Sequence, residues 1–112
     1  MRRHAAVLAL ACGIATASLA QVPARDLFVR ADKGNCIACH QLPAGAGPPT
    51  RADVGPPLIG ERMRALGKPA IGASIADPTR ANPDTVMPPY GRHHLLDAAE
   101  IARLVEFLHA LP

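Results

Sequence analysis

Residues 34–40 read GNCIACH, and within this stretch Cys36, Cys39 and His40 form a Cys-x-x-Cys-His pattern. Three kinds of chemistry use such a pattern: binding of a metal ion, thiol–disulfide exchange, and covalent attachment of haem. Each of these makes different demands on the rest of the chain. The sequence around the pattern therefore decides the fold class as well as the chemistry.

Two of these alternatives find little support in the remaining sequence. A structural zinc site needs four ligands, but the only other cysteine is Cys12, and His93 and His94 are the only closely spaced candidates to complete a set. A thiol redox site usually lies where a strand enters a helix of an α/β fold. No segment of this chain has the alternating or β-branched pattern of a strand.

Covalent haem attachment uses every residue of the motif. Two intervening residues allow the sulfurs of Cys36 and Cys39 to form thioethers with the two vinyl groups at one edge of the porphyrin. The adjoining His40 then presents its imidazole to the iron. The sequence therefore predicts one covalently bound haem c, with His40 as an axial ligand of its iron.

A haem that carries electrons also needs a second axial ligand, because an open site binds oxygen or peroxide. Outside the first twenty residues the chain has two methionines, Met63 and Met87. Met87 lies in VMPPYG, where prolines stiffen the backbone, so we expect it to be the second iron ligand. Met63 lies on an expected helical turn, where packing is the usual role of a thioether. Packing is the alternative role of Met87 too, and the rival ligands are His93, His94 and His109.

A support for His40 is expected in the segment GPPL, residues 55–58. An iron-bound imidazole normally donates its other ring N–H to a backbone carbonyl, which fixes the tautomer and the ring orientation. A proline-rich loop holds its carbonyls rigidly, and we expect Pro56 to provide the acceptor. The alternative is that these prolines only stiffen the loop.

The first twenty residues have the pattern of an export signal. MRRH is a short basic head, and AAVLALACGIATASLA is an apolar run that ends in small residues, with cleavage expected after Ala20. The run is shorter than the ~20 apolar residues of a membrane-spanning helix. We therefore expect residues 1–20 to be a signal peptide. Residues 21–112 are then a single monohaem domain in the periplasm, with no membrane association after cleavage.

Composition excludes some functions of the exported part. Without Arg2 and Arg3, ten basic residues face nine acidic ones, so the formal net charge falls from +3 to +1. No basic stripe remains that would bind nucleic acid. Hydrophobic residues make up 49% of the chain but aromatic residues only 3%. A small chain with so few large side chains buries a modest core, and a bulky apolar cofactor would fill its centre.

The chain is expected to be all-α with long loops rich in proline and glycine. A short amphipathic helix over residues 24–32 leads into the motif, and Gly34 ends it. Prolines and glycines exclude helix and strand from residues 41–60. Asp97 and Glu100 form a capping-box pattern before an amphipathic helix over residues 98–110.

The middle of the chain gives a weaker pattern. Residues 61–76 are expected to hold only one or two helical turns, because Gly67, Pro69 and Gly72 interrupt them. Residues 82–92, NPDTVMPPYGR, are expected to form a loop that carries Met87.

This order of features resembles the class I c-type cytochromes, in which a helix, a Cys-x-x-Cys-His motif, a Gly-Pro loop, a methionine loop and a closing helix follow one another. A narrower resemblance lies in IADPTRANPDTVMPPYGRHHLLDAAEIARLVEFL, residues 75–108. This segment is similar to the C-terminal half of the SoxX subunit of bacterial thiosulfate-oxidising systems. Its most specific part is NPDTVMPPYG, residues 82–91.

The resemblance implies an all-α, cytochrome c-like single domain whose helices wrap around one covalently attached haem. His40 and Met87 would be its axial ligands, and Pro56 would support His40. It also implies an electron-transfer subunit of an L-cysteine S-thiosulfotransferase complex, which is not catalytic alone. Such a subunit pairs with a larger SoxA-like haem subunit and passes electrons to a downstream acceptor cytochrome. From their position beside the motif and the methionine loop, the candidates for contact with that partner are Ile37, Pro88, Pro89 and Tyr90, and the alternative role of each is packing on the haem.

Two other functions stay open. A free-standing periplasmic carrier that serves a terminal oxidase would use the same haem residues and differ only in its partner. A haem enzyme or gas sensor would leave the position opposite His40 open, because Met87 would not bind the iron.

Overall fold

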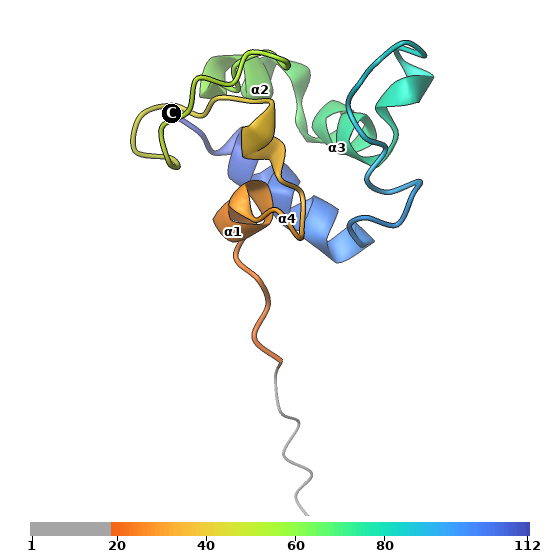
Figure 1. The fold of residues 1–112 in the computed structure, drawn as a ribbon, viewed down its shortest axis with the longest axis horizontal. Coiled ribbons are helices and arrows are strands. Elements are labelled where there is room, and N and C mark those ends of the chain that lie inside the picture. Colours follow the sequence, from red (N-terminus) through yellow and green to blue (C-terminus); the bar gives the residue numbers. More distant parts are fainter. Residues whose placement is uncertain (1–18) are drawn as a thin grey trace, which may run out of the picture.

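The computed structural model describes residues 19–112 of the chain (Figure 1). The expected signal peptide lies almost wholly outside the described residues, and Cys12 lies outside them too. The described chain forms, in order, α1 (Ala24–Val29), η1 (Cys36–Ala38), α2 (Gly60–Leu66), α3 (Lys68–Ala76), η2 (Pro78–Arg80) and α4 (Ala98–His109), where η marks a 3-10 helix. Its only β-type pairing is an isolated bridge between Ala44 and Gly47. The expectation of a helical domain without strands is confirmed for this part of the chain.

Helix α4 begins at a complete capping box. The Asp97 side chain accepts a hydrogen bond from the Glu100 backbone N–H (2.7 Å), and the Glu100 side chain accepts one from the Asp97 N–H (3.0 Å). Two backbone donors that the helix itself leaves free are thereby satisfied. The helix covers residues 98–109, one residue shorter than expected, and it buries Leu104 and Leu108 in the core.

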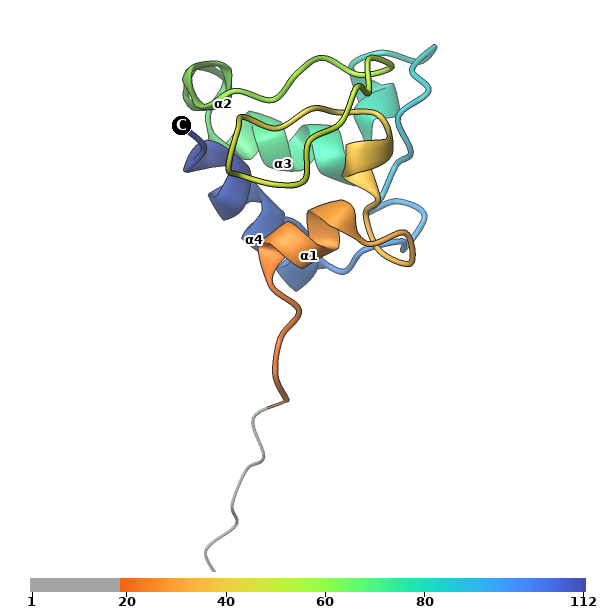
Figure 2. The same cartoon turned by 60° about the vertical axis from the view of Figure 1, so that its left-hand side comes forward.

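Helices α1 and α3 both pack against α4, and α4 passes behind α1 in both views (Figures 1 and 2). Phe28 of α1 is only 1% exposed, and its ring lies 6.1 Å from that of Phe107 on α4, at an interplanar angle of 57°. Such tilted aromatic pairs add to the stability gained from burial. The buried core consists of Leu27, Phe28, Met63, Ile71, Ile75, Tyr90, Leu96, Leu104, Val105, Leu108 and Leu111.

Helix α1 is shorter than the expected range of residues 24–32. It ends at Val29, and Arg30 already has extended backbone angles. The chain turns back at this point, so that the Gly34 N–H donates to the Leu27 carbonyl at 3.0 Å. That carbonyl would otherwise accept a bond from a continuing helix. The early end of α1 thus fixes where the Cys-x-x-Cys-His motif begins.

The middle of the chain corrects the expectation of one or two helical turns, because residues 60–76 are almost entirely helical. Gly67, with a φ of 81°, separates α2 from α3 and adopts a backbone conformation that only glycine takes up easily. Pro69 lies in the first turn of α3, where its missing N–H breaks no helical hydrogen bond. Gly67 and Pro69, which suggested that no long helix forms here, therefore mark the junction between two helices.

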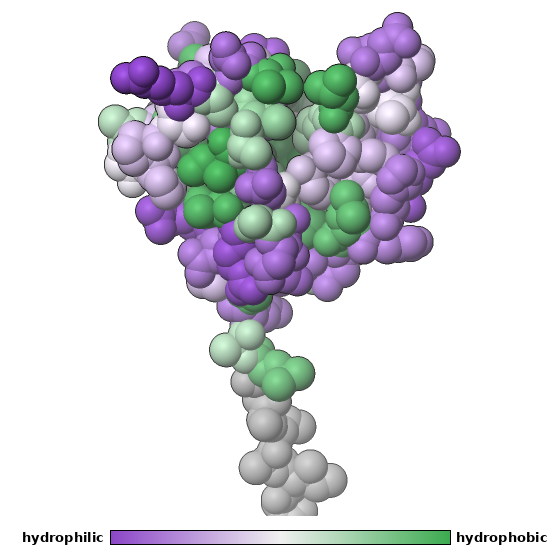
Figure 3. Space-filling model, in the orientation of Figure 1, coloured by the Kyte–Doolittle hydropathy of each residue, from purple (hydrophilic) through white to green (hydrophobic). Residues whose placement is uncertain are grey.

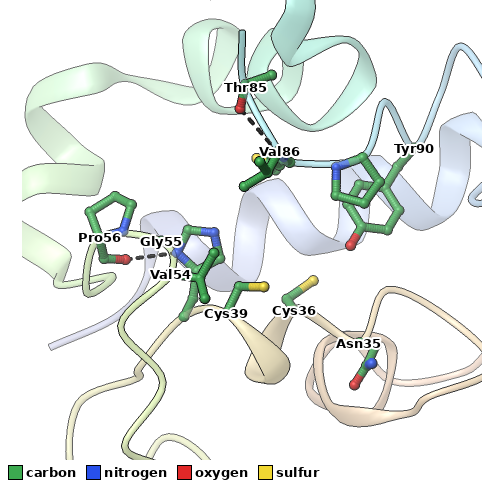
Figure 4. A pocket seen from close by; sticks show the side chains of 12 residues that line it. Asn35, Cys36, Cys39, Val54, Gly55, Pro56, Thr85, Val86 and Tyr90 are labelled. Carbon is green, nitrogen blue, oxygen red and sulfur yellow. Dashed lines mark hydrogen bonds between the residues drawn. The ribbon is translucent and has the colours of Figure 1, made fainter.

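Two long loops, the first loop (residues 41–59) and the methionine loop (residues 82–92), are tied to the helical framework on the side of the motif. The Gly55 N–H donates to the Cys39 carbonyl (2.8 Å), which fixes the first loop beside the motif. The Tyr90 and Gly91 N–H groups donate to the carbonyls of Ile75 (3.1 Å) and Ala76 (3.0 Å) at the end of α3. These contacts bring residues 54–56 and 85–90 to either side of the motif (Figure 4). Within residues 19–112, no helix is long and apolar enough to cross a membrane.

Candidate functional site

The Cys-x-x-Cys-His motif forms a tight turn on η1. Asn35 precedes it with left-handed backbone angles (φ 46°), and the His40 N–H donates to the Cys36 carbonyl at 2.9 Å. Cys36 and Cys39 are both free thiols and half-buried. Figure 4 shows their sulfurs directed from η1 toward the loop that carries Thr85 and Val86. Both thiols therefore point into the same space.

The His40 ring is held by the residues of the first loop. Its Nδ1 lies 2.7 Å from the Pro56 carbonyl oxygen, so the ring donates its Nδ1–H there (Figure 4). A Cβ atom added to Gly55 would lie 2.6 Å from His40 Nδ1, which is closer than two such atoms can approach. The contact with Pro56 leaves Nε2 as the ring nitrogen with a free lone pair. His40 thus has the tautomer and the support that an iron-binding histidine needs.

Two adjoining hollows surround these side chains. The first hollow lies between the motif and the two loops (Figure 4), and it is lined by Asn35, Cys36, Cys39, His40, Val54, Gly55, Pro56, Thr85, Val86, Met87, Pro88 and Tyr90. The second hollow lies between the motif and helices α2, α3 and α4, and it is lined by Phe28, Cys36, His40, Pro56, Leu58, Arg62, Met63, Leu66, Ile71, Ser74, Ile75, Met87, Tyr90, Leu104 and Leu108. Cys36, His40, Pro56, Met87 and Tyr90 line both. The two hollows therefore adjoin each other at these five residues, and the walls of both are mostly apolar.

All five residues singled out from the sequence, Cys36, Cys39, His40, Pro56 and Met87, line the first hollow. Met87 also lines the second, and its backbone N–H donates to Thr85 Oγ1 at 3.1 Å. Met63 lines only the second hollow and is 4% exposed within the core, as its expected packing role requires. The rival histidines His93, His94 and His109 line neither hollow.

The environment of Cys36 is unsuited to thiol–disulfide exchange. Burial raises the pKa of its thiol to about 11, whereas cysteines that exchange disulfides have a lowered pKa and react as thiolates. Within residues 19–112, no three His, Cys, Asp or Glu side chains gather where they could together hold a metal ion. The donor set of the hollow is instead two thiols, one imidazole and one thioether.

Comparison with known proteins agrees with this donor set. Residues 23–108 match the family model described as cytochrome C oxidase, cbb3-type, subunit III. The chain belongs to this cytochrome c family. A search of the curated proteins finds no match. The matched range covers η1, both loops, α1 to α3 and all of α4 except its last residue, so both hollows lie wholly within a cytochrome c domain. Such a domain is an electron-transfer haem protein that binds haem c covalently, and domains of this kind are typically exported.

The residues of this cytochrome domain fit a haem. Cys36 and Cys39 would form the thioethers, and His40, held by Pro56, would bind the iron through Nε2. The mostly apolar walls of the two hollows suit the porphyrin, which is apolar except for its two carboxylates. Arg62 is the only Lys, Arg, Asp or Glu side chain that lines either hollow within the described chain. It would therefore offset the charge of a haem carboxylate.

Several lining residues of the cytochrome domain were not singled out from its sequence. Val54, Thr85 and Val86 line the first hollow, while Arg62 and Ser74 line the second. Arg62 lies on α2 and Ser74 on α3. The glycines and prolines of this segment had suggested only one or two helical turns, so the full extent of these helices was not predicted. No sequence pattern marks Val54, because only the fold of the first loop brings it near the motif.

The surface around the hollows is partly apolar. Figure 3 shows several hydrophobic patches on one face of the molecule, bordering a hollow near its upper edge, with polar side chains over most of the remainder. Val54 and Val86, on opposite loops of the first hollow, are 62% and 79% exposed. Exposed apolar side chains that gather at a functional site favour contact with another protein.

Proposed function

We propose that this cytochrome is the SoxX-like, small electron-transfer subunit of a thiosulfate-oxidising L-cysteine S-thiosulfotransferase complex, exported to the periplasm and carrying one haem. The observation that supports this most is the position of NPDTVMPPYG. This string is the most specific part of the resemblance to SoxX, and it forms one wall of the first hollow, where it places Met87 across from the motif. The segment that distinguishes the subunit type is thus also a segment of the redox site.

Joining thiosulfate to the thiol of a carrier protein through a new S–S bond releases two electrons and one proton. The bound haem supplies a one-electron couple, so the two electrons leave one at a time. Met/His ligation raises the reduction potential of a haem, which suits a subunit that accepts electrons. His40 and Met87 would hold the iron in both oxidation states, and the walls of the hollows would exclude water. In this proposal the larger subunit carries the chemistry of the sulfur atoms.

The rim of the first hollow is the proposed contact with the larger, SoxA-like haem subunit. Val54, Val86 and Pro88 are exposed there, and a formal charge of +1 outside residues 1–20 offers little long-range steering. A permanent subunit can rely on such an apolar contact. Tyr90, a candidate for this contact from the sequence, is only 8% exposed, so it is excluded as a partner contact by its burial.

The test is purification of the tagged protein from its native periplasm at low salt and at roughly 0.5 M salt, where the Debye length is ~4 Å and ion pairs are screened. We expect a larger subunit with its own covalent haem to remain bound at both salt concentrations. The purified pair should join thiosulfate to a cysteine of a carrier protein. Val86→Asp should weaken the pair, whereas Leu95→Asp, at a residue that is 50% exposed but lines neither hollow, should not. Recovery of the chain alone at both salt concentrations would contradict the proposal.

A second function is favoured by the family description, which names a subunit of a cbb3-type oxidase. In that case the cytochrome would pass electrons toward a terminal oxidase, as a free-standing carrier or as a bound component. The haem residues would be the same. Reduced protein that is oxidised rapidly by membranes containing a cbb3-type oxidase, together with no bound haem subunit, would favour this function over the first.

A further inference from the structure

Tyr90 makes a contact that haem binding alone does not require. Its hydroxyl donates a hydrogen bond of 2.6 Å to the Gly34 carbonyl, although the two residues are 56 positions apart. Tyr90 is 8% exposed, so water does not compete for this bond. Gly34 lies two residues before Cys36. Figure 4 shows the Tyr90 hydroxyl turned toward the segment that contains Asn35 and Cys36. Among the described residues, this is the only side-chain hydrogen bond that joins the Met87 loop to the segment leading into the motif.

The backbone around Tyr90 is held by hydrogen bonds on both sides. The Tyr90 N–H donates to the Ile75 carbonyl at 3.1 Å, and the Leu95 N–H donates to the Tyr90 carbonyl at 2.9 Å. Only Pro88 and Pro89 separate Tyr90 from Met87, and each proline has a fixed φ. The position of Tyr90 therefore restricts the position of Met87, because the two residues are joined by a short segment with few free backbone angles.

The Gly34 side of the contact is equally constrained. Gly34 is buried, and its N–H donates to the Leu27 carbonyl of α1 at 3.0 Å. A Cβ at this position would lie 2.8 Å from Cys36 Sγ and 2.8 Å from the Leu27 oxygen. The carbonyl that Tyr90 reaches is thus fixed relative to both α1 and the first thioether position. Burial also raises the pKa of Tyr90 to about 12, so its hydroxyl keeps its proton and remains a donor.

We propose that Tyr90 is a positioning residue for the sixth iron ligand: its hydroxyl bond to Gly34 holds residues 85–88 at a fixed place relative to the haem-attachment motif. This inference rests on the proposed haem with Met87 as a ligand. The bond joins two segments that each carry one side of the iron site, the motif with His40 and the loop with Met87. Without it, the loop remains tied to α3 but not to the motif.

The test compares the holoprotein with its Tyr90→Phe variant, which keeps the ring in both hollows and removes only the hydroxyl. Oxidised haem with a methionine ligand has a weak sulfur-to-iron charge-transfer band in the red. This band disappears as pH rises, because hydroxide and neutral amines compete with the thioether. In Tyr90→Phe the population without methionine should rise roughly two- to ten-fold at a given pH, which is the value of one buried hydrogen bond. For a transition that takes up one hydroxide or releases one proton, the midpoint of band loss should accordingly fall by about 0.3–1 pH unit.

The matched control is Lys33→Met. Lys33 Nζ donates to Glu100 Oε1 at 2.6 Å, which ties the segment before the motif to α4 without touching the methionine loop. This variant loses a partly buried contact and global stability, but the midpoint of band loss should stay at the native value. An unchanged midpoint in Tyr90→Phe, or an equal fall in both variants, would overturn the inference and leave Tyr90 a general stabilising residue.

A second readout separates failure of this inference from failure of the proposed ligand. The hydrogen-exchange rate of the Met87 amide, which is bonded to Thr85 Oγ1, reports on the loop itself. If the native protein lacks the band, Met87 is not the ligand. Faster exchange in Tyr90→Phe than in both the native protein and Lys33→Met would then still support the positioning of residues 85–88, and equal exchange in all three would overturn it.

Discussion

The two thiols of the motif, Cys36 and Cys39, would each form its own thioether with the haem. Both sulfurs point into the same hollow (Figure 4), and neither is joined to another cysteine. We expect Cys36→Ser combined with Cys39→Ser to lose all haem that survives denaturing electrophoresis. The measurement is peroxidase-type staining of the denatured protein, with each single variant as an intermediate case. Unchanged staining of the double variant would remove the c-type assignment.

Gly55 packs closely on the His40 ring, and adding a single Cβ atom at this residue tests how much that contact contributes to stability. A Cβ at this residue would lie 2.6 Å from His40 Nδ1, so Gly55→Ala must displace the ring or the loop. We expect a loss of about 1–3 kcal/mol in the free energy of unfolding, as for other overpacked sites. Urea unfolding measures this change.

The control for Gly55→Ala is Gly72→Ala. A Cβ at Gly72 meets only Val105 Cγ2 at 3.5 Å, an ordinary contact, and lies within α3. Alanine favours a helix over glycine by about 1 kcal/mol, so this variant should be as stable as the native protein or more stable. Equal destabilisation in both variants would mean that the packing of Gly55 on His40 has no special importance.

At the scale of elements, the ion pair between Lys33 and Glu100 joins the segment before the motif to the start of α4. Hydrogen bonding from Lys33 and from the Asp97 backbone lowers the pKa of Glu100 below its ordinary value of 4.5. A carboxyl group with a lowered pKa in the folded state stabilises the fold above its unfolded pKa. That stability is lost as pH falls below about 4.5 and through the lower, folded-state pKa.

Glu100→Gln should therefore weaken the fold at pH 7 by roughly 1.5–3 kcal/mol, the range for hydrogen bonds to charged groups. The difference between the variant and the native protein should shrink toward pH 3. Thermal unfolding at a series of pH values measures both effects. A constant difference across the series would show that the charge of Glu100 does not contribute, and that only its shape does.

Helix boundaries show where the sequence was sufficient and where it was not. The start of α4 was predictable because Asp97 and Glu100 form a local capping pattern, and such contacts lie within one turn. The extent of α2 and α3 was not predictable, because Gly67 and Pro69 read equally well as helix breakers and as a helix junction. Packing of α3 against α4, a contact distant in sequence, decides between the two.

At the scale of the whole molecule, the haem site depends on contacts that span the chain. The motif itself was evident from Cys36, Cys39 and His40, because their spacing is set by the chemistry. The walls of the hollows were not, since Val54, Arg62 and Ser74 come near the motif only through the tertiary fold. The Tyr90 bond to Gly34 likewise has no local pattern. The sequence thus predicts the reacting groups better than it predicts their surroundings.

We expect one chain to supply both axial ligands of a covalently bound haem, His40 from the motif and Met87 from the methionine loop. Both side chains line the same two hollows, whereas Met63 lines one of them from within the core. The identity of the iron ligands is tested most directly by a spectroscopic signal that arises from the iron and its ligands.

The measurement is the absorption spectrum of the oxidised protein in three forms: native, Met87→Ala and Met63→Ala. We expect a weak sulfur-to-iron band in the red for the native protein and for Met63→Ala, and no such band for Met87→Ala. Loss of the band in Met63→Ala alone would contradict the assignment of the ligand. A native protein without the band that binds carbon monoxide rapidly when reduced would instead show an open site, and hence a haem enzyme or gas sensor.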